Sequence, residues 1–561
     1  MSNKNIKYLS KLQRVKKLSQ PIIHLLDKTR LLPVFIPMIN WSMRKMKIKR
    51  QFQKDLNYRL IGKAAKNSLK PLGNQKEKVI IIPFLSTGNS IFLLINILIA
   101  YRFQKKGYRS IFIICDKFLP ICTNERLFKT REEDAHICTN CYGPFPYLSK
   151  IIGAEFIKLS EYYNKQNTSE IDNLLSELKT IKDCKSFFYK NLPLGAYAEK
   201  SVLRFFLTGE LREKKEHVDV YRKFLKTLIY FSSSFEEILN SKGIQPELML
   251  FYNGTLSIET YMREYCLEHN IDYVTHETYV GSNSWVYKKN GEVMKLNWDE
   301  YFDASKQLNL DEQKQAKEFI EGLRYGKLMY EKLNNTVPLD KRLIENDFVV
   351  LFTNLNFDTT VLGRNPIFES MQNWIDEVIE YWITNEIKTK LVIRIHPAEL
   401  KLITASEDFV APRIIDKIKG KENIILFDAA DEVDSYTLIE NMKFGLIYSS
   451  TIGLEIAYYG KHCLIGGDAF YKNQNFVIPS ENRKDYFEKL QNLLLNSPEI
   501  VDNKESILRF IHFIYFDRVN WLNGITMDHK NHLNVFNFES IEELEQKNEE
   551  TLIKFEKEIL C

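Results

Sequence analysis

The feature that most constrains the fold is a repeated alternation of short β-branched runs with loops and helix-like stretches. The run 78–85 (KVIIIPFL) is continuously apolar, as is typical of a parallel strand covered on both faces. Four similar runs follow, at 110–116, 154–160, 247–253 and 272–277. This alternation predicts an α/β domain with a parallel sheet, interrupted by a long helical insertion around 160–245.

A second series of the same kind begins after the charged segment 334–347. Its runs are 348–354, 390–396, 423–428, 444–449 and 463–467, and 368–385 reads as a helix between the first two. A chain of 561 residues is long for one hydrophobic core. The fold class predicted is therefore α/β, with two Rossmann-like domains facing a cleft.

These patterns also suggest how the chain is divided. We expect a basic N-terminal helical arm over 1–70, and a first Rossmann-like domain over 71–340 that contains the helical insertion. A second Rossmann-like domain should cover 341–500. The charged, helical stretch 501–561 should cross back and brace the first domain.

The N-terminal arm has an extreme charge. Residues 1–70 hold 18 basic residues against Asp27 and Asp55, which gives +16 and leaves −11 for the remainder of a chain of net charge +5. A solvated tail, a membrane-surface anchor and a nucleic-acid-binding segment would all suit such a composition. Aromatic and apolar residues interleaved with the basic ones favour an anionic membrane surface, and the acidic remainder argues against nucleic acid.

The apolar stretches 31–41 and 91–101 are too short to span a bilayer, which needs about 20 apolar residues. The first residues also lack the compact apolar stretch and cleavage site of a signal peptide. The eight cysteines are sparse, which suits a reducing compartment. We therefore expect a cytoplasmic protein that is peripheral to the inner face of the membrane.

One cysteine cluster allows two interpretations. Cys115, Cys122, His136, Cys138 and Cys141 lie close together in sequence, and HICTNC has the C-x-x-C spacing of a zinc knuckle. No second C-x-x-C completes the pattern. A structural zinc on Cys122, Cys138 and Cys141 therefore competes with incidental or redox-active thiols, and we assign no metal to the functional site and expect no tightly bound cofactor.

Polar residues follow two strands of the second series, where ligands bind in open α/β sheets. The strand at 390–396 leads to His396 and then Pro397, and the strand at 444–449 leads to Ser449, Ser450 and Thr451. Simple helix capping with a structural histidine is one interpretation. The other is a phosphate site, in which the hydroxyls and helix start after one strand and the histidine at the end of an adjacent strand bind one anion. Glu455 would then accept hydrogen bonds from a ribose.

These residues resemble a known group of proteins. RIHPAEL (394–400) and YSSTIGLEIAYYGK (448–461) resemble the paired HP and S-S/T motifs of bacterial capsule-type glycosyltransferases, which include polysialyltransferases and Kdo transferases of GT-B fold. The likeness is strongest over 348–480 and includes DSY (434–436) and GGDAFY (466–471). It implies that His396, Ser449 and Ser450 hold the donor phosphate, and that Thr451 or Glu455 supports the nucleotide.

The same resemblance implies that the first domain binds the acceptor and supplies any general base. The D/E-D/E-G base motif of polysialyltransferases is not found there. Asp116 and Glu277, both at predicted strand ends, are the candidates, because a carboxylate buried near a cleft can reach a pKa near working pH. We count them, together with His396, as catalytic candidates.

The function predicted is transfer of a sugar from a nucleotide-sugar co-substrate, with CMP-linked donors favoured by the resemblance. The acceptor would be a glycan or a lipid-linked molecule of bacterial surface polysaccharide (capsule or O-antigen) biosynthesis. A polyol-phosphate transferase of the teichoic-acid type and a non-catalytic polysaccharide-assembly factor are the alternatives.

Overall fold

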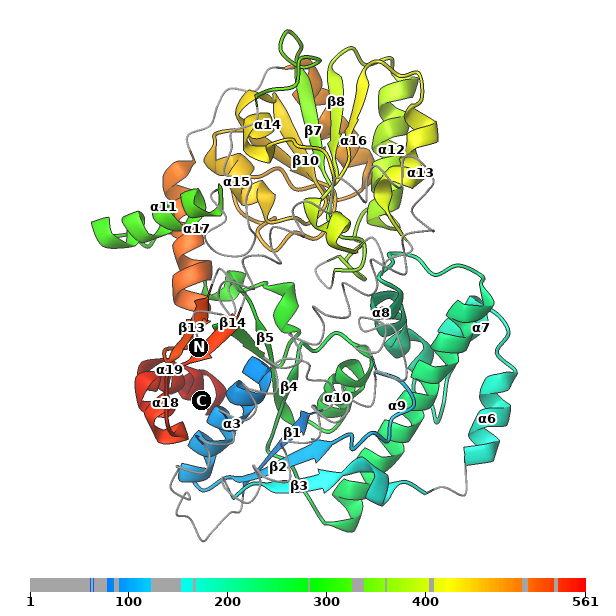
Figure 1. Ribbon diagram of the computed structural model, residues 1–561, viewed down its shortest axis with the longest axis vertical. Coiled ribbons are helices and arrows are strands. Elements are labelled where there is room, and N and C mark those ends of the chain that lie inside the picture. Colours follow the sequence, from blue (N-terminus) through cyan, green and yellow to red (C-terminus); the bar gives the residue numbers. More distant parts are fainter. Residues whose placement is uncertain are drawn as a thin grey trace, which may run out of the picture.

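A computed structural model describes residues 61, 64, 78–84, 90–122, 153–164, 168–280, 283–324, 338–358, 361–402, 408–496, 503–528 and 533–560. The molecule is elongated, and two sheets occupy its two ends (Figure 1). All ten runs predicted as strands contain one, each within a few residues of the expected bounds. The prediction of two Rossmann-like domains is confirmed.

The first sheet has seven strands in the order β12-β6-β5-β4-β1-β2-β3. Their bounds are β1 Val79–Phe84, β2 Arg109–Ile114, β3 Glu155–Lys158, β4 Leu248–Tyr252, β5 Asp272–Thr278, β6 Ser284–Lys289 and β12 Asn520–Trp521. The first five are parallel, whereas β6 and β12 add an antiparallel edge. The chain runs outward from β1 to β3 and then restarts at β4 on the other side of β1, so the switch in direction lies between β1 and β4.

Helices cover both faces of this sheet. One face packs against α6 Thr168–Ser176, α7 Ile181–Lys185, α8 Leu194–Phe206, α9 Lys215–Ser241 and α10 Ser257–Glu268. The other packs against α3 Ser90–Lys105 and the C-terminal helices. The predicted insertion around 160–245 is thus helical, and 27 of its residues form α9.

The second sheet has five parallel strands in the order β11-β10-β7-β8-β9. They are β7 Phe348–Phe352, β8 Lys390–Arg394, β9 Ile424–Phe427, β10 Phe444–Ile447 and β11 His462–Ile465. One face is covered by α12 Met371–Thr384, α13 Val410–Ile418 and α16 Arg483–Leu495. The other is covered by α14 Ser435–Asn441, α15 Ile452–Tyr458, α11 Leu310–Arg324 and α17 Lys504–His512.

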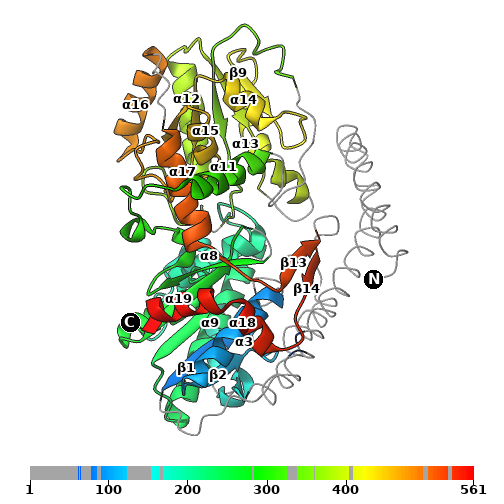
Figure 2. The same ribbon diagram turned by 90° about the vertical axis from the view of Figure 1, so that its left-hand side faces the viewer.

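The C-terminal segment returns to the first domain. Helix α17 continues into a π-helical turn, Phe513–Arg518, that runs from the second domain to the first (Figure 2). After β12 come a hairpin, β13 Ile525–Asp528 with β14 Leu533–Phe536, and two helices, α18 Ile541–Lys547 and α19 Glu549–Leu560. These two helices lie along α3 (Figure 2).

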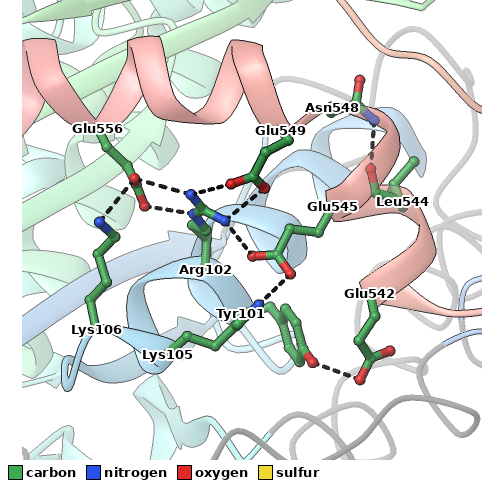
Figure 3. Close-up of polar contacts among 10 residues, drawn as sticks. All are labelled: Tyr101, Arg102, Lys105, Lys106, Glu542, Leu544, Glu545, Asn548, Glu549 and Glu556. Carbon is green, nitrogen blue, oxygen red and sulfur yellow. Dashed lines mark hydrogen bonds and ion pairs between the residues drawn. The ribbon is translucent and has the colours of Figure 1, made fainter.

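A cluster of charged side chains holds α18 and α19 against α3. The guanidinium of Arg102 on α3 lies among Glu545, Glu549 and Glu556, with N–O distances of 3.0, 2.8 and 2.7 Å (Figure 3). The Arg102 side chain is 13% exposed, and those of Glu545 and Glu556 are 2% and 7% exposed. Lys105 adds a second cation to Glu545 at 2.8 Å. The last 20 residues are therefore tied electrostatically to the first domain.

Two predictions fall wholly or mostly outside the described residues. The basic arm lies there except for Ile61 and Ala64, which are buried against the first domain. Three members of the cysteine cluster, at 136, 138 and 141, lie there as well. Where side chains are described, no group of three or more potential ligands is arranged to hold a metal ion. None of the helices in the described ranges combines the length and apolar character of a membrane span.

Candidate functional site

In open α/β sheets the binding crevice lies where the chain changes direction, which in the second sheet is between β7 and β10. Strand β7 is central, with β8 on one side and β10 on the other. His396 follows β8 and Ser449 follows β10, so their strands are two spacings apart, about 10 Å. We expected these residues on adjacent strands, and that detail was wrong because β7 lies between them.

The loop after β7 fills the space between the two strands. Thr353 accepts a hydrogen bond at Oγ1 from the backbone amide of His396, at 3.0 Å. Asn354 accepts one at Oδ1 from the backbone amide of Ser449, at 3.4 Å. Thr353 and Asn354 therefore link the two predicted halves of the site. The pattern FTN at the end of the strand 348–354 was the sequence signal for them, and it was overlooked.

The ring of His396 has a defined orientation. Its Nδ1 accepts a hydrogen bond from the backbone amide of Ala398, at 3.1 Å. In the neutral ring the proton therefore sits on Nε2. Pro397 begins a short 3-10 turn, Pro397–Leu402, which redirects the chain directly after the histidine. His396 thus presents an N–H donor from a half-buried position at the strand end.

The three hydroxyl residues after β10 differ in their surroundings. Ser449 is buried, whereas Thr451 is exposed and its side chain makes no cap hydrogen bond. Ser450 accepts at Oγ from the amide of Ile452, at 3.5 Å, and its carbonyl accepts from the hydroxyl of Tyr471. Helix α15 begins at Ile452, as predicted, but has only seven residues. The hydroxyls and amides are therefore better suited than the helix dipole to bind an anion.

Glu455 occupies a different environment from the one predicted. Its side chain is buried inside the second domain, and its carboxylate accepts a hydrogen bond from the hydroxyl of Tyr436 on α14. This contact ties α15 to α14. The predicted ribose contact of Glu455 stays a prediction, and the observed contact is structural.

The two candidate bases of the first domain are far apart. Asp116 follows β2 and Glu277 lies in β5, with β1 and β4 between them. Three strand spacings amount to about 14 Å, so the two carboxylates cannot serve one reacting atom. Asp116 accepts hydrogen bonds from the amide and the hydroxyl of Ser160, which hold the turn after β3. This arrangement favours a structural role for Asp116.

The surroundings of Glu277 shift the pKa of its carboxyl group. Asn253 donates to its Oε2 at 3.0 Å, and the amide of Thr278 donates to its Oε1, also at 3.0 Å. Burial raises the pKa of Glu277 to about 7, and hydrogen bonds including those from Tyr252 and Asn253 oppose that rise. The backbone of Asn253 itself is in the left-handed region, with φ 57°. A carboxyl that titrates near neutral pH suits a general base.

A second buried carboxyl lies nearby and was not predicted. Glu259, in the first turn of α10, also has its pKa raised to about 7, first by burial and then by the charge of Glu277. The segment NGTLSIETY (253–261) contains it, but a glutamate in a first helical turn is ordinary in sequence. Only the fold brings it close to Glu277. His276, by contrast, faces α3, where its Nε2 contacts Asn96 Oδ1 at 2.9 Å.

Aromatic and cation–π contacts lie where the two domains meet. Tyr279, two residues after Glu277, stacks on Tyr515, with ring centroids 5.8 Å apart. Arg204 of α8 lies over the ring of Phe357 in the loop after β7, with its guanidinium carbon 5.5 Å from the centroid. The Glu277 side of the first domain therefore faces the crevice of the second.

Comparisons with known proteins bear on this architecture. Residues 301–476 match a family described as capsule polysaccharide biosynthesis protein. No curated protein matches the chain. Among solved structures, the chain is similar to the β-Kdo 2,4-transferase of Thermosulfurimonas dismutans KpsC, at 11% identity and TM-score 0.33, over 53% of this chain and 87% of that one.

Two further solved structures illustrate the range of similarity. The β-Kdo 2,7-transferase of the same protein is 13% identical, with TM-score 0.29, over 55% of this chain and 88% of that one. A glycosyltransferase from Rickettsia africae is 12% identical, with TM-score 0.27, over 87% of this chain and 99% of that one.

The fold and the crevice define the class: a two-domain α/β protein of GT-B type, with a polar crevice in the second domain facing a buried carboxylate in the first. The match over 301–476 covers most of the second domain and confirms the resemblance to capsule polysaccharide biosynthesis proteins predicted from its sequence.

Proposed function

We propose that this protein transfers a sugar from a nucleotide-sugar donor to an acceptor in the synthesis of a bacterial capsule polysaccharide. One observation carries the proposal. In the domain that matches the capsule family, the ends of β8, β7 and β10 are joined into one polar crevice by the contacts of Thr353 with His396 and of Asn354 with Ser449.

The donor phosphate would lie over the end of β7. His396 would donate from Nε2, on the β8 side, and the hydroxyls of Ser449 and Ser450 would donate from the β10 side. A phosphate spans only part of the 10 Å between the strands, so the side chains must reach inward above Thr353. Charge-assisted hydrogen bonds of this kind hold the leaving nucleotide and stabilise the charge that it gains.

Glu277 would act as the general base. In its ionised form it would take the proton of the acceptor hydroxyl as that oxygen bonds to the anomeric carbon and the nucleotide leaves with its phosphate. Its pKa of about 7 leaves a useful fraction ionised at neutral pH. Glu259, close to it, would favour the protonated form of Glu277 and so tune this equilibrium.

The finer identity of the substrates belongs to the same proposal. A CMP-linked donor is favoured by the likeness of the HP and S-S/T motifs to sialyl- and Kdo-type transferases. A glycan or lipid-linked acceptor would suit a protein whose first 70 residues carry a charge of +16. Those residues would bind the anionic inner face of the membrane and keep the enzyme near its acceptor.

A thermal-shift titration with CMP, CDP, UDP and GDP tests the proposal. We expect the nucleotides of one nucleobase to raise the melting temperature of the full-length protein in a concentration-dependent manner. This stabilisation should be lost in His396→Ala. His269→Ala is a matched control, because His269 lies at the end of α10 and stacks on Tyr265 instead. Absence of any nucleotide effect on the unsubstituted protein would contradict the proposal.

A further inference from the structure

Arg364 is a buried arginine with no partner for its charge among the described residues. Its exposed fraction is 7%, and its Nη2 makes no hydrogen bond. In the parts of the chain that the structure describes, no carboxylate lies within ion-pair distance of its guanidinium. Arg364 belongs to the loop between β7 and α12, at the same sheet end as Thr353 and Asn354.

The loop that contains Arg364 contacts the first domain. Gly363 has φ 70°, and a side chain at that position would meet Cε of Lys200, on α8, at 2.8 Å. The positive φ favours glycine here, and the close approach shows that the end of the Lys200 side chain lies against this loop. Lys200 and Arg364 therefore lie near each other across the boundary between the domains, and the charge of Arg364 helps to lower the pKa of Lys200.

The carboxylates around this pair are committed elsewhere. Glu292 forms ion pairs with three cations of the first domain: Lys295 at 3.2 Å, Lys200 at 3.9 Å, and Arg263 in close contact. Its Oε2 also accepts from Thr255 at 3.3 Å. One carboxylate shared in this way does not neutralise the group.

Two aspartates of the second domain also attract Arg364. Asp468 is paired with Lys472 at 2.6 Å, and Asp358 belongs to the same loop as Arg364. Burial is the main cause that lowers the pKa of both Arg364 and Lys200, and the ion pair of Lys200 with Glu292, at 3.9 Å, is the longest of the three that Glu292 makes.

We propose that Arg364 and Lys200 form a subsite that binds an oxyanion of the donor across the two domains. This inference rests on the proposed function and deepens it. A planar guanidinium binds a carboxylate or a phosphate through two parallel hydrogen bonds, and Lys200 adds a point charge from the opposite side. The oxyanion is distinct from the phosphate over β7, and is either the carboxylate of an acidic sugar or the second phosphate of a nucleoside diphosphate.

The position of the pair explains why such a subsite would be useful. One cation comes from each domain, so the bound anion bridges them and draws the cleft closed. Removing the oxyanion leaves two cations in a poorly solvated place, which opposes closure. The subsite therefore couples donor binding to the approach of Glu277 to the crevice.

Calorimetric titration of the full-length protein with three probes tests the proposal: CMP, CDP and CMP-N-acetylneuraminate. Arg364→Met should weaken binding of CDP or of CMP-N-acetylneuraminate by about ten- to hundredfold, while binding of CMP changes by less than about threefold. An effect on CDP identifies a second phosphate, and an effect on CMP-N-acetylneuraminate identifies a sugar carboxylate. Arg483→Ala, an exposed arginine on α16, is the matched control and should change nothing.

The outcomes separate this inference from the proposed function. If the unsubstituted protein binds CMP but Arg364→Met binds all three probes normally, or all three equally weakly, the subsite is overturned and the proposed function stands. If the unsubstituted protein binds none of the three, the subsite and the preference for a CMP-linked donor both fail, and the titration with UDP and GDP decides the proposed function. Melting without ligand gives a second test: Arg364→Met should keep or raise the melting temperature, because an unpaired buried charge is removed. A marked fall would show a structural role and overturn the subsite.

Discussion

The backbone amide of His396 donates to Thr353 Oγ1 at 3.0 Å, which fastens the end of β8 to the end of β7. The backbone amide of Thr353 in turn donates to the carbonyl oxygen of Arg394, at 3.1 Å. Two consecutive contacts thus extend the pairing of β7 and β8 beyond the sheet. The imidazole is thereby set at a fixed height above the end of β7.

We expect His396→Ala to lower donor affinity or turnover about ten- to hundredfold, because one charge-assisted hydrogen bond to the phosphate is lost. Folding stability should change little, since the ring is half-buried at a strand end. Ser450→Ala should act in the same direction, and the double variant should show less than the sum if both bind one phosphate. A lower melting temperature with nucleotide binding intact would instead support simple capping.

Thr353→Val should act through His396. The substitution keeps the shape of the side chain but removes the acceptor for the His396 amide. Donor affinity should fall about three- to tenfold, from loss of one neutral hydrogen bond of roughly 1 kcal/mol. Combining it with His396→Ala should add nothing further to the loss of affinity. Additive effects would show that Thr353 acts independently of the histidine.

Glu277→Gln should abolish most turnover while leaving donor binding within about threefold, because the amide oxygen can still accept from Asn253 but cannot take a proton. In the unsubstituted enzyme, turnover should rise as the pH increases through about 7, where Glu277 loses its proton. Initial rates between pH 5.5 and 8.5 measure this. Full activity of Glu277→Gln would favour a non-catalytic assembly factor or a different base.

Glu259 should make the free energy of unfolding depend on pH. Its pKa is about 7 when folded, above the ordinary value of 4.5, so folding favours the protonated form. This favourable contribution is complete below about pH 4.5 and is lost as the pH rises through 7. Glu259→Gln should therefore stabilise the protein at pH 8, on the order of 1–3 kcal/mol, and have much less effect at pH 5. Denaturant titrations at the two pH values measure the difference.

Arg102→Met should destabilise the protein by about 3–5 kcal/mol, since Glu545 and Glu556 would keep buried charges without their main partner. Lys78→Ala is the control: it removes an exposed pair with Glu247 and should cost less than about 1 kcal/mol. Urea unfolding measures both. Equal effects would show that the C-terminal helices are held by apolar packing alone.

The basic arm predicts membrane attachment. The full-length chain should co-sediment with vesicles containing anionic phospholipid at low salt, and a variant lacking residues 1–70 should not. Raising the salt concentration should release the full-length protein. Retention of the shortened protein on the vesicles would contradict the assignment.

The strands were predictable because parallel strands covered on both faces leave continuous apolar runs such as 78–85 and 348–352. His396, Ser449 and Ser450 were predictable for a related reason: they follow such runs directly. The order of the strands was not predictable. It depends on which side of β7 the strand after β9 pairs, and β10 pairs on the side opposite β8. The sequence consequently suggested adjacent strands for His396 and Ser449, where the fold inserts β7.

Other members of the site depend on distant contacts. Arg364 and Lys200 are 164 positions apart in sequence, and each is an ordinary charged residue in its own segment. Glu277 was found because it ends a strand, but Asp116 met the same criterion and lies about 14 Å from it by strand spacing. Only the sheet order distinguishes the two carboxylates.

An experimental structure with a bound nucleotide is the most direct test of the proposed phosphate site. We expect a phosphate over the end of β7, within hydrogen-bond distance of His396 Nε2 and of a hydroxyl of Ser449 or Ser450, with Glu277 facing the cleft. A nucleotide whose phosphate lies elsewhere, with His396 and both serines making no contact to it, would contradict the site.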